Sequence, residues 1–532
     1  MATFKRDVDA ALAEVARDNL VQRIWARDDT VWKHGPGEIT DRLGWLTVVA
    51  DLRERVGELA AFAAEVRDAG YADVVLLGMG GSSLAPEVLR ASFGKQRGYP
   101  RLHVLDSTVP AWVRRVTRSI DPGRTLFIVS SKTGGTIEVV SFFKYFHGLV
   151  ASLRGKRAGD SFIAITDPNT GLQKMAETYG FRRVFTNPAD IGGRYSALSY
   201  FGLVPAALAG IDPLRLLDSG LRMVSACGPG VPAAGNPGAW LGAALGAMER
   251  AGRDKVTIVT SPSVVAFGLW AEQLLAESTG KEGKGLVPVA QEPPAAVSAY
   301  GKDRIFVYLR LDGDDNAASD THAANLESAG QPVIPLALRS CFDLGAEFFR
   351  WEFATALAGA LIGIHPFDQP NVQESKDNTA AVLSQVSAGG QPPALEATGS
   401  LPALLAQAKR GDYVALLAYV DETPLVDAAF RDLRHALLER CHLPSTLGYG
   451  PRYLHSTGQL HKGGPGSGLF VQMTADWGTD LPVPGEAYTF AGLAASQAAG
   501  DYKSLQTHQR RVIRIHLGQR AAASIRKLAG AM

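Results

Sequence analysis

The chain has 532 residues, of which 46% are hydrophobic and 20% are charged, as in an ordinary globular protein. A chain of this length should form two or three domains with sizeable cores. Its net charge of +1 argues against a dedicated nucleic-acid surface and against a basic membrane patch. The cysteines lack disulfide or zinc spacing, and neither a signal peptide nor an apolar run long enough to span a bilayer is found. We therefore expect a cytoplasmic protein without nucleic-acid or membrane partners.

The predicted elements begin with a helical lead-in over residues 1–44. In the domain that follows, 45–227, strands are predicted at 73–77, 102–105, 126–129 and 162–165. In a second domain, 228–395, strands are predicted at 255–259, 303–309 and 332–336. Helices alternate with these strands, which predicts an α/β fold with two doubly wound parallel sheets. A linker rich in Gly, Pro and Ala at 388–402 leads into a C-terminal mixed α/β extension, 396–532.

The stretch 126–138 joins a buried strand to a helix through a loop rich in hydroxyl groups and glycine. The polar residues of this loop are Ser131, Lys132, Thr133 and Thr136. Backbone N–H groups point outward at a helix N-terminus, and the helix dipole favours negative charge there. Phosphate needs several convergent donors of this kind. The loop therefore predicts a phosphate site, although a plain strand–loop–helix turn is the alternative.

A second glycine-rich loop, 78–83, is one residue away from the dinucleotide fingerprint, because Ser83 stands at the third glycine position. Asp106 ends the next strand, where a ribose-binding acid would lie. An NAD-dependent dehydrogenase is therefore a competing interpretation. Two hydroxyl-rich loops on neighbouring strands suit one terminal phosphate better than a pyrophosphate.

Segments 78–86, 131–136 and 192–196 resemble, in this order, three segments of the phosphoglucose isomerase family. Segments 273–281 and 367–376 resemble those that bear the family's catalytic glutamate and lysine. The chain is most similar to the isomerase half of bacterial transaldolase–phosphoglucose isomerase fusions, here without the transaldolase. The resemblance implies two sugar-isomerase (SIS) domains and isomerisation of glucose 6-phosphate and fructose 6-phosphate without a metal or another cofactor.

Aldose–ketose isomerisation needs a base that moves a proton between C1 and C2, and the resemblance assigns this role to Glu277. It places Arg194 beside the developing enediolate and Lys376 near the ring oxygen or O1. The substrate-binding residues that it implies are Gly81, Ser82, Ser131, Lys132, Thr133, Thr136, Gly193, Gln273 and Gln369. Without the resemblance, Glu277 and Lys376 would be interpreted as solvated surface charges and Arg194 as a surface or ion-pair residue.

The family also uses a histidine to open the sugar ring. Residues 455–460 resemble its His-x-x-x-Gln-Leu segment, so His455 is the preferred candidate, with Arg452 a secondary residue of that site. In the classical enzymes this histidine lies between the glutamate and the lysine, whereas His455 follows Lys376. His322 is the alternative, and His365 is expected to be structural.

Three further expectations depend on the resemblance. Because the family's histidine comes from a partner subunit, a homodimer is possible. The substrate could be another sugar phosphate, such as mannose 6-phosphate. A rival of a different class is a SIS-type protein that binds a sugar phosphate without converting it.

Overall fold

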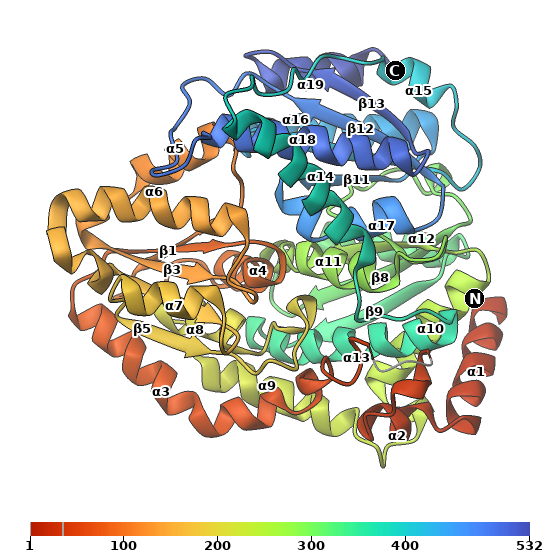
Figure 1. Cartoon of the computed structure of the whole chain (residues 1–532). Helices are drawn as coiled ribbons and strands as arrows, with labels where there is room; N and C mark the ends of the chain where they lie inside the picture. The colour runs from red at the N-terminus through yellow and green to blue at the C-terminus, as the bar shows by residue number, and fades with distance from the viewer. Residues whose placement is uncertain (1, 34–36) are drawn as a thin grey trace.

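The computed structural model describes residues 2–33 and 37–532. These residues form three parallel sheets, each surrounded by helices (Figure 1). The first sheet lies on the left of the view, the second on the lower right, and the third, in blue, above both. The prediction of an α/β fold with parallel-sheet domains is confirmed, and the C-terminal α/β extension contains a third parallel sheet.

The first sheet has the strand order β2-β1-β3-β4-β5, and all its strands are parallel. Its strands are β1 (Asp73–Gly78), β2 (Arg101–Leu105), β3 (Thr125–Ser130), β4 (Phe162–Thr166) and β5 (Arg183–Thr186). Its helices are α3 (Val48–Asp68), α4 (Leu84–Phe93), α5 (Pro110–Ser119), α6 (Ile137–Arg154), α7 (Gly171–Thr178), α8 (Tyr200–Leu208) and α9 (Pro213–Ala226). Every residue of the central strands β1 and β3 is buried, as continuous apolar runs predict.

The second sheet has the order β7-β6-β8-β9 and is also parallel. Its strands are β6 (Lys255–Thr260), β7 (Val287–Ala290), β8 (Arg304–Leu311) and β9 (Val333–Leu338). Its helices are α10 (Pro237–Arg250), α11 (Phe267–Thr279), α12 (Ala317–Ser328) and α13 (Leu344–Ile362). Helices α1 (Ala2–Arg17) and α2 (Leu20–Trp25) lie at its side, near α10 (Figure 1).

The third sheet repeats the topology of the second, with the order β11-β10-β12-β13 and parallel pairing. Its strands are β10 (Tyr413–Tyr419), β11 (Ser445–Tyr449), β12 (Gly468–Thr474) and β13 (Arg511–His516). The helices of this part are α15 (Leu401–Leu405), α16 (Pro424–Cys441), α17 (Gly458–Gly463), α18 (Phe490–Thr507) and α19 (Ala521–Gly530). Helix α14 (Pro370–Ser387) precedes the linker in sequence but packs against α18 (Figure 1).

The first sheet joins the other two domains because its two faces belong to different cores. Val74 and Leu76 of β1 point into a core shared with the second domain. Val75 and Leu77 point the other way, into a core shared with the third domain. This alternation follows from the two-residue period of a strand. Within the described residues, no helix is long and apolar enough to cross a membrane.

Candidate active site

The predicted phosphate loop lies between β3 and α6, with its hydroxyl groups close together. Ser131 Oγ is 3.0 Å from Thr136 Oγ1, and the N–H of Gly134 donates to Ser131 Oγ at 3.1 Å. Gly134 has φ +71°, a backbone conformation that favours glycine. Among the described residues, the N–H groups of Thr133 and Thr136 have no protein acceptor. The loop therefore offers backbone and hydroxyl donors to an anion at the N-terminus of α6.

Lys132 differs from its predicted role at this loop. Its ammonium group pairs with Asp167 and also donates to the carbonyl of Ala189 at 3.0 Å. The Lys132 charge is therefore already compensated by a protein carboxylate. Thr133 is exposed and Ser82 is buried at the end of β1.

The glycine-rich loop after β1 contacts both other parts of the site through its backbone. A Cβ atom on Gly81 would lie 2.0 Å from the carbonyl oxygen of Gly193, which begins the turn carrying Arg194. A Cβ atom on Gly80 would lie 2.5 Å from the carbonyl oxygen of His455. Only glycine permits these close approaches, so the loop brings Arg194 and His455 toward the same cleft.

Arg194 and Glu277 form a buried ion pair between the first and second domains. Arg194 Nη1 lies 3.1 Å from Glu277 Oε1, and only 2% of the arginine side chain is exposed. The guanidinium group also donates to Ser278 Oγ at 2.8 Å and to Gln369 Oε1 at 2.9 Å. Its remaining acceptors are the carbonyls of Pro366, at 2.6 Å, and Asp368, at 3.0 Å. These contacts hold a fixed positive charge beside the carboxylate.

Gln273 joins Glu277 to His455. One turn of α11 separates Gln273 from Glu277, so both point to the same side of the helix. Gln273 Nε2 donates to Glu277 Oε2 at 3.0 Å and to the carbonyl of His455 at 2.8 Å. The candidate base and the candidate ring-opening histidine are therefore linked through a single amide.

Sequence analysis missed the partner of His455. Glu138 lies in the first turn of α6, two residues after Thr136, and its Oε1 is 2.8 Å from His455 Nε2. Burial opposes ionisation of Glu138, but the adjacent His455 favours it, and the pKa of the carboxyl is lowered overall. The position of Glu138 directly after the phosphate loop is the sequence signal that could have indicated this residue.

Lys376 and Lys281 lie at the edges of this arrangement. Lys376, on α14, is exposed, and its charge helps to lower the pKa of Glu138. Lys281, which sequence analysis did not select, lies 2.7 Å from Asp368 and close to Arg194. Burial lowers the pKa of Lys281 to about 7, and the charge of Arg194 adds to this effect.

The structure does not bring His322 or Asp106 to this site. His322 Nε2 lies 3.2 Å from the hydroxyl of Tyr300 on another side of the second domain. Asp106 is fully buried, 3.5 Å from Arg452, and bonded to Ser83 Oγ at 3.3 Å. It is therefore not available to bind a ribose, which removes the main support for a dehydrogenase. His365, which is expected to be structural, accepts a hydrogen bond at Nδ1 from the N–H of Phe367.

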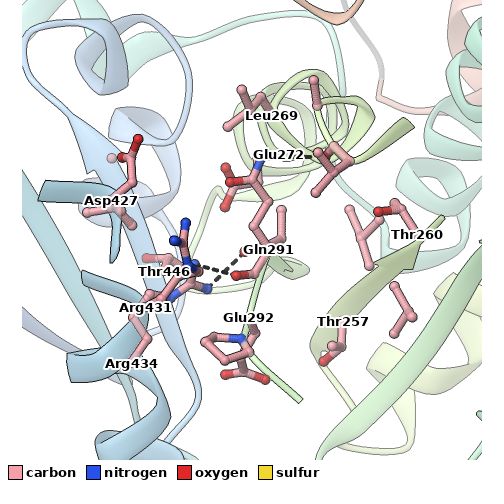
Figure 2. Close-up of a pocket in the computed structure, with 18 of the residues that line it drawn as sticks. Thr257, Thr260, Leu269, Glu272, Gln291, Glu292, Asp427, Arg431, Arg434 and Thr446 are labelled. Atoms are coloured by element: carbon pink, nitrogen blue, oxygen red, sulfur yellow. Dashed lines mark hydrogen bonds between the residues drawn. The ribbon is translucent and has the colours of Figure 1, made fainter. Parts of the chain in front are cut away.

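A cavity of about 550 Å³ is lined by other residues than those of this cleft. Figure 2 shows it between the second sheet and the third domain, and its labelled lining residues include Thr260, Leu269, Glu272, Gln291, Arg431 and Thr446. None of the described residues that line it belongs to the phosphate loop or to the Arg194–Glu277 pair. The residues with the chemistry of the candidate active site therefore lie outside this cavity.

The fold and the site define an α/β protein with parallel sheets that combines a loop of hydroxyl and backbone N–H donors with a buried arginine–glutamate ion pair between two domains. A family model described as phosphoglucose isomerase matches residues 46–227. Glucose-6-phosphate isomerase of Rubrobacter xylanophilus is 30% identical over an alignment of 385 residues that covers 63% of this chain and 87% of that protein. The chain therefore belongs to the phosphoglucose isomerase family.

Two further similarities agree with this assignment. Glucose-6-phosphate isomerase of Parabacteroides distasonis is 27% identical over 72% of this chain and 97% of its own length. The crystal structure of a glucose-6-phosphate isomerase from Chlamydia trachomatis shares the fold, with a TM-score of 0.61 at 19% identity, over 71% of this chain and 86% of that one.

Proposed function

We propose that this chain interconverts glucose 6-phosphate and fructose 6-phosphate. The observation that carries the proposal is a set of hydrogen bonds that joins three parts of the cleft. Gln273 donates to Glu277 and to the backbone carbonyl of His455, and the imidazole of His455 bonds Glu138 beside the phosphate loop. These hydrogen bonds gather a carboxylate, an imidazole and an anion-binding loop from three domains. The family relatives named above carry the same activity in their names.

In the proposed reaction the loop 131–136 holds the phosphate and His455 opens the ring. Its Nε2 faces Glu138, which leaves Nδ1 for the sugar. His455 gives a proton to the ring oxygen as the C1–O5 bond breaks, and the C1 hydroxyl loses its proton to water as the aldehyde forms. His455 is preferred to His322 because only His455 contacts residues of the cleft.

Glu277 then removes the proton from C2 of the open-chain aldose, and the electrons form the C1–C2 double bond of the enediol. Arg194 stabilises the negative charge that develops on the oxygens. Glu277 returns its proton to C1 as O2 becomes the carbonyl of the ketose. The proton that O1 gains equals the one that O2 loses, so the reaction is balanced.

The test compares the wild type with Glu277→Gln in the conversion of fructose 6-phosphate to glucose 6-phosphate. Loss of a positioned base should lower kcat by about 10²- to 10⁴-fold. Glu272→Gln is the matched control, because Glu272 lies on the same helix but faces the cavity of Figure 2. Full activity of Glu277→Gln would refute the role of the base. Faster turnover of mannose 6-phosphate than of fructose 6-phosphate would make mannose 6-phosphate the preferred substrate. Binding of a sugar phosphate without turnover would indicate a sensor.

We also propose an oligomeric state and a cellular location for the active chain. Because His455 reaches the cleft of its own chain, we propose that one chain suffices for activity, whether or not two chains form a homodimer. Specific activity should then be independent of protein concentration across the range in which any dimer dissociates. We further propose that the chain is a cytoplasmic enzyme related to the isomerase half of transaldolase fusions. It should then be active as an isomerase without added transaldolase.

A further inference from the structure

A chain of buried hydrogen bonds lies behind His455. Glu138 Oε1 accepts from His455 Nε2 at 2.8 Å and also from Gln497 Nε2 at 2.7 Å. Gln497 Oε1 in turn accepts from the hydroxyl of Thr108 at 2.6 Å. One carboxylate oxygen thus receives two donors, and the second donor is itself held in place by a third residue.

Burial makes each of these contacts costly to lose. Glu138 is 3% exposed, Gln497 is 1% exposed and Thr108 is fully buried. The amide orientation of Gln497 is fixed, because the opposite orientation would place its oxygen against the oxygen of Glu138. His455, with 15% of its side chain exposed, is the only one of the four that reaches the cleft.

The two donors to Glu138 come from the same domain. His455 lies in the short 3-10 helix Arg452–His455 and Gln497 in α18, both of the third domain. Glu138 and Thr108 belong to the first domain. The Glu138 carboxylate therefore accepts two hydrogen bonds from the third domain, which restrict both its position and that of the imidazole.

We propose that Gln497 is a positioning residue for ring opening, whose amide holds Glu138 in the orientation that accepts the hydrogen bond of His455. This inference deepens the proposed function and rests on it for the role of His455. Gln497 touches no substrate; it acts through Glu138 and His455. Thr108 acts one step further away by fixing the amide of Gln497.

The proposal predicts a particular pH dependence. A donor to a carboxylate stabilises the charged form, so removing Gln497 should raise the pKa of Glu138. Without the Gln497 donor the carboxylate is also less firmly oriented, so its hydrogen bond with His455 Nε2 should weaken. The other titratable groups that interact with Glu138 are Lys376, whose charge lowers the pKa of Glu138, and two tyrosines, Tyr419 and Tyr488, whose pKa values the charge of Glu138 helps to raise. The variants below leave all three unchanged.

Two substitutions at Gln497 separate positioning from mere packing. Gln497→Leu keeps the approximate volume but removes both hydrogen bonds, and kcat should fall about tenfold or more with KM little changed. The acidic limb of its pH profile should move upward. Gln497→Glu can donate as a neutral acid, so its kcat should approach the wild-type value at low pH and fall as that acid ionises. Gln506→Leu, at an exposed position of α18, is the control and should leave the profile unchanged.

A second measurement does not depend on turnover. The Nε2–H proton signal of His455, followed by NMR and assigned by its loss in His455→Gln, should change its chemical shift in Gln497→Leu, because the hydrogen bond to Glu138 weakens. If Gln497→Leu does not fold, Thr108→Val should give a smaller change in the same direction. An unchanged His455 signal in the folded variants overturns the inference even if the wild type is active. A changed signal in a protein without isomerase activity supports the positioning contact and refutes the proposed function.

Discussion

Replacing Arg194 by methionine tests the buried ion pair at the centre of the site. Methionine keeps most of the length of the side chain but removes every donor. Glu277 then loses its compensating charge, and the carbonyls of Pro366 and Asp368 lose their donor. Breaking a buried pair by removing one partner costs about 3–5 kcal/mol. Because 11% of the Glu277 side chain is exposed, water can solvate the carboxylate in part, and we expect the lower end, about 3 kcal/mol.

The double variant Arg194→Met with Glu277→Gln completes the test. Glutamine removes the uncompensated charge, so the double variant should be about 1–2 kcal/mol more stable than Arg194→Met alone. Equilibrium unfolding in urea, with the midpoint and slope compared among the four proteins, measures the coupling. A loss below about 1 kcal/mol in Arg194→Met, or purely additive effects, would refute the reasoning. Arg53→Met removes an arginine with an exposed ion pair and should cost at most about 1 kcal/mol.

Three further predictions concern other parts of the molecule. Burial raises the pKa of Glu272 from 4.5 to about 8, so the folded protein holds a proton that the unfolded chain releases. The wild type should therefore lose stability as the pH rises from about 5 to 8, and Glu272→Gln should lose less. Thermal unfolding midpoints measured against pH test this, and parallel curves for the two proteins would contradict it. Gly81→Ala places a Cβ 2.0 Å from the oxygen of Gly193, so it should lower the free energy of unfolding by about 1–3 kcal/mol and remove most of the activity. Gly57→Ala is the control and should be harmless, because the space around Gly57 is open. Equal unfolding midpoints and activities in the two variants would count against the close contact. Lys376→Met should change the unfolding free energy by less than about 0.5 kcal/mol, because the side chain is exposed, yet lower kcat; an unchanged kcat would exclude Lys376 from the reaction.

The central strands of the first two sheets could be predicted from sequence because burial on both faces leaves a continuous apolar run. The runs at 126–129 and 255–259 became β3 and β6 within one residue at each end. Strand β5 was missed because it is a four-residue edge strand with mostly part-exposed residues. Strand β7, also at an edge, contains Pro288, which weakens any strand prediction.

In the third sheet, sequence patterns could indicate single strands but not the order in which they pair. Strands β10 and β12 are apolar and wholly buried, so their local signal equals that of the first sheet. Their edge partners, β11 and β13, contain part-exposed residues, and no local pattern shows that they pair in the same order as the second sheet. Pairing order depends on contacts between distant segments, which periodicity does not encode.

Sequence alone determined the local chemistry of this protein: hydroxyl- and glycine-rich turns at strand ends, and Gln273 one helical turn before Glu277. Such features depend on neighbours within a few residues, where spacing and backbone geometry decide the outcome. Only the tertiary structure decided that His455, from the last domain, reaches Glu138, 317 residues away, in the same chain. A hydrogen bond forms only within about 3 Å, so this pairing required three domains to pack through the two faces of one sheet.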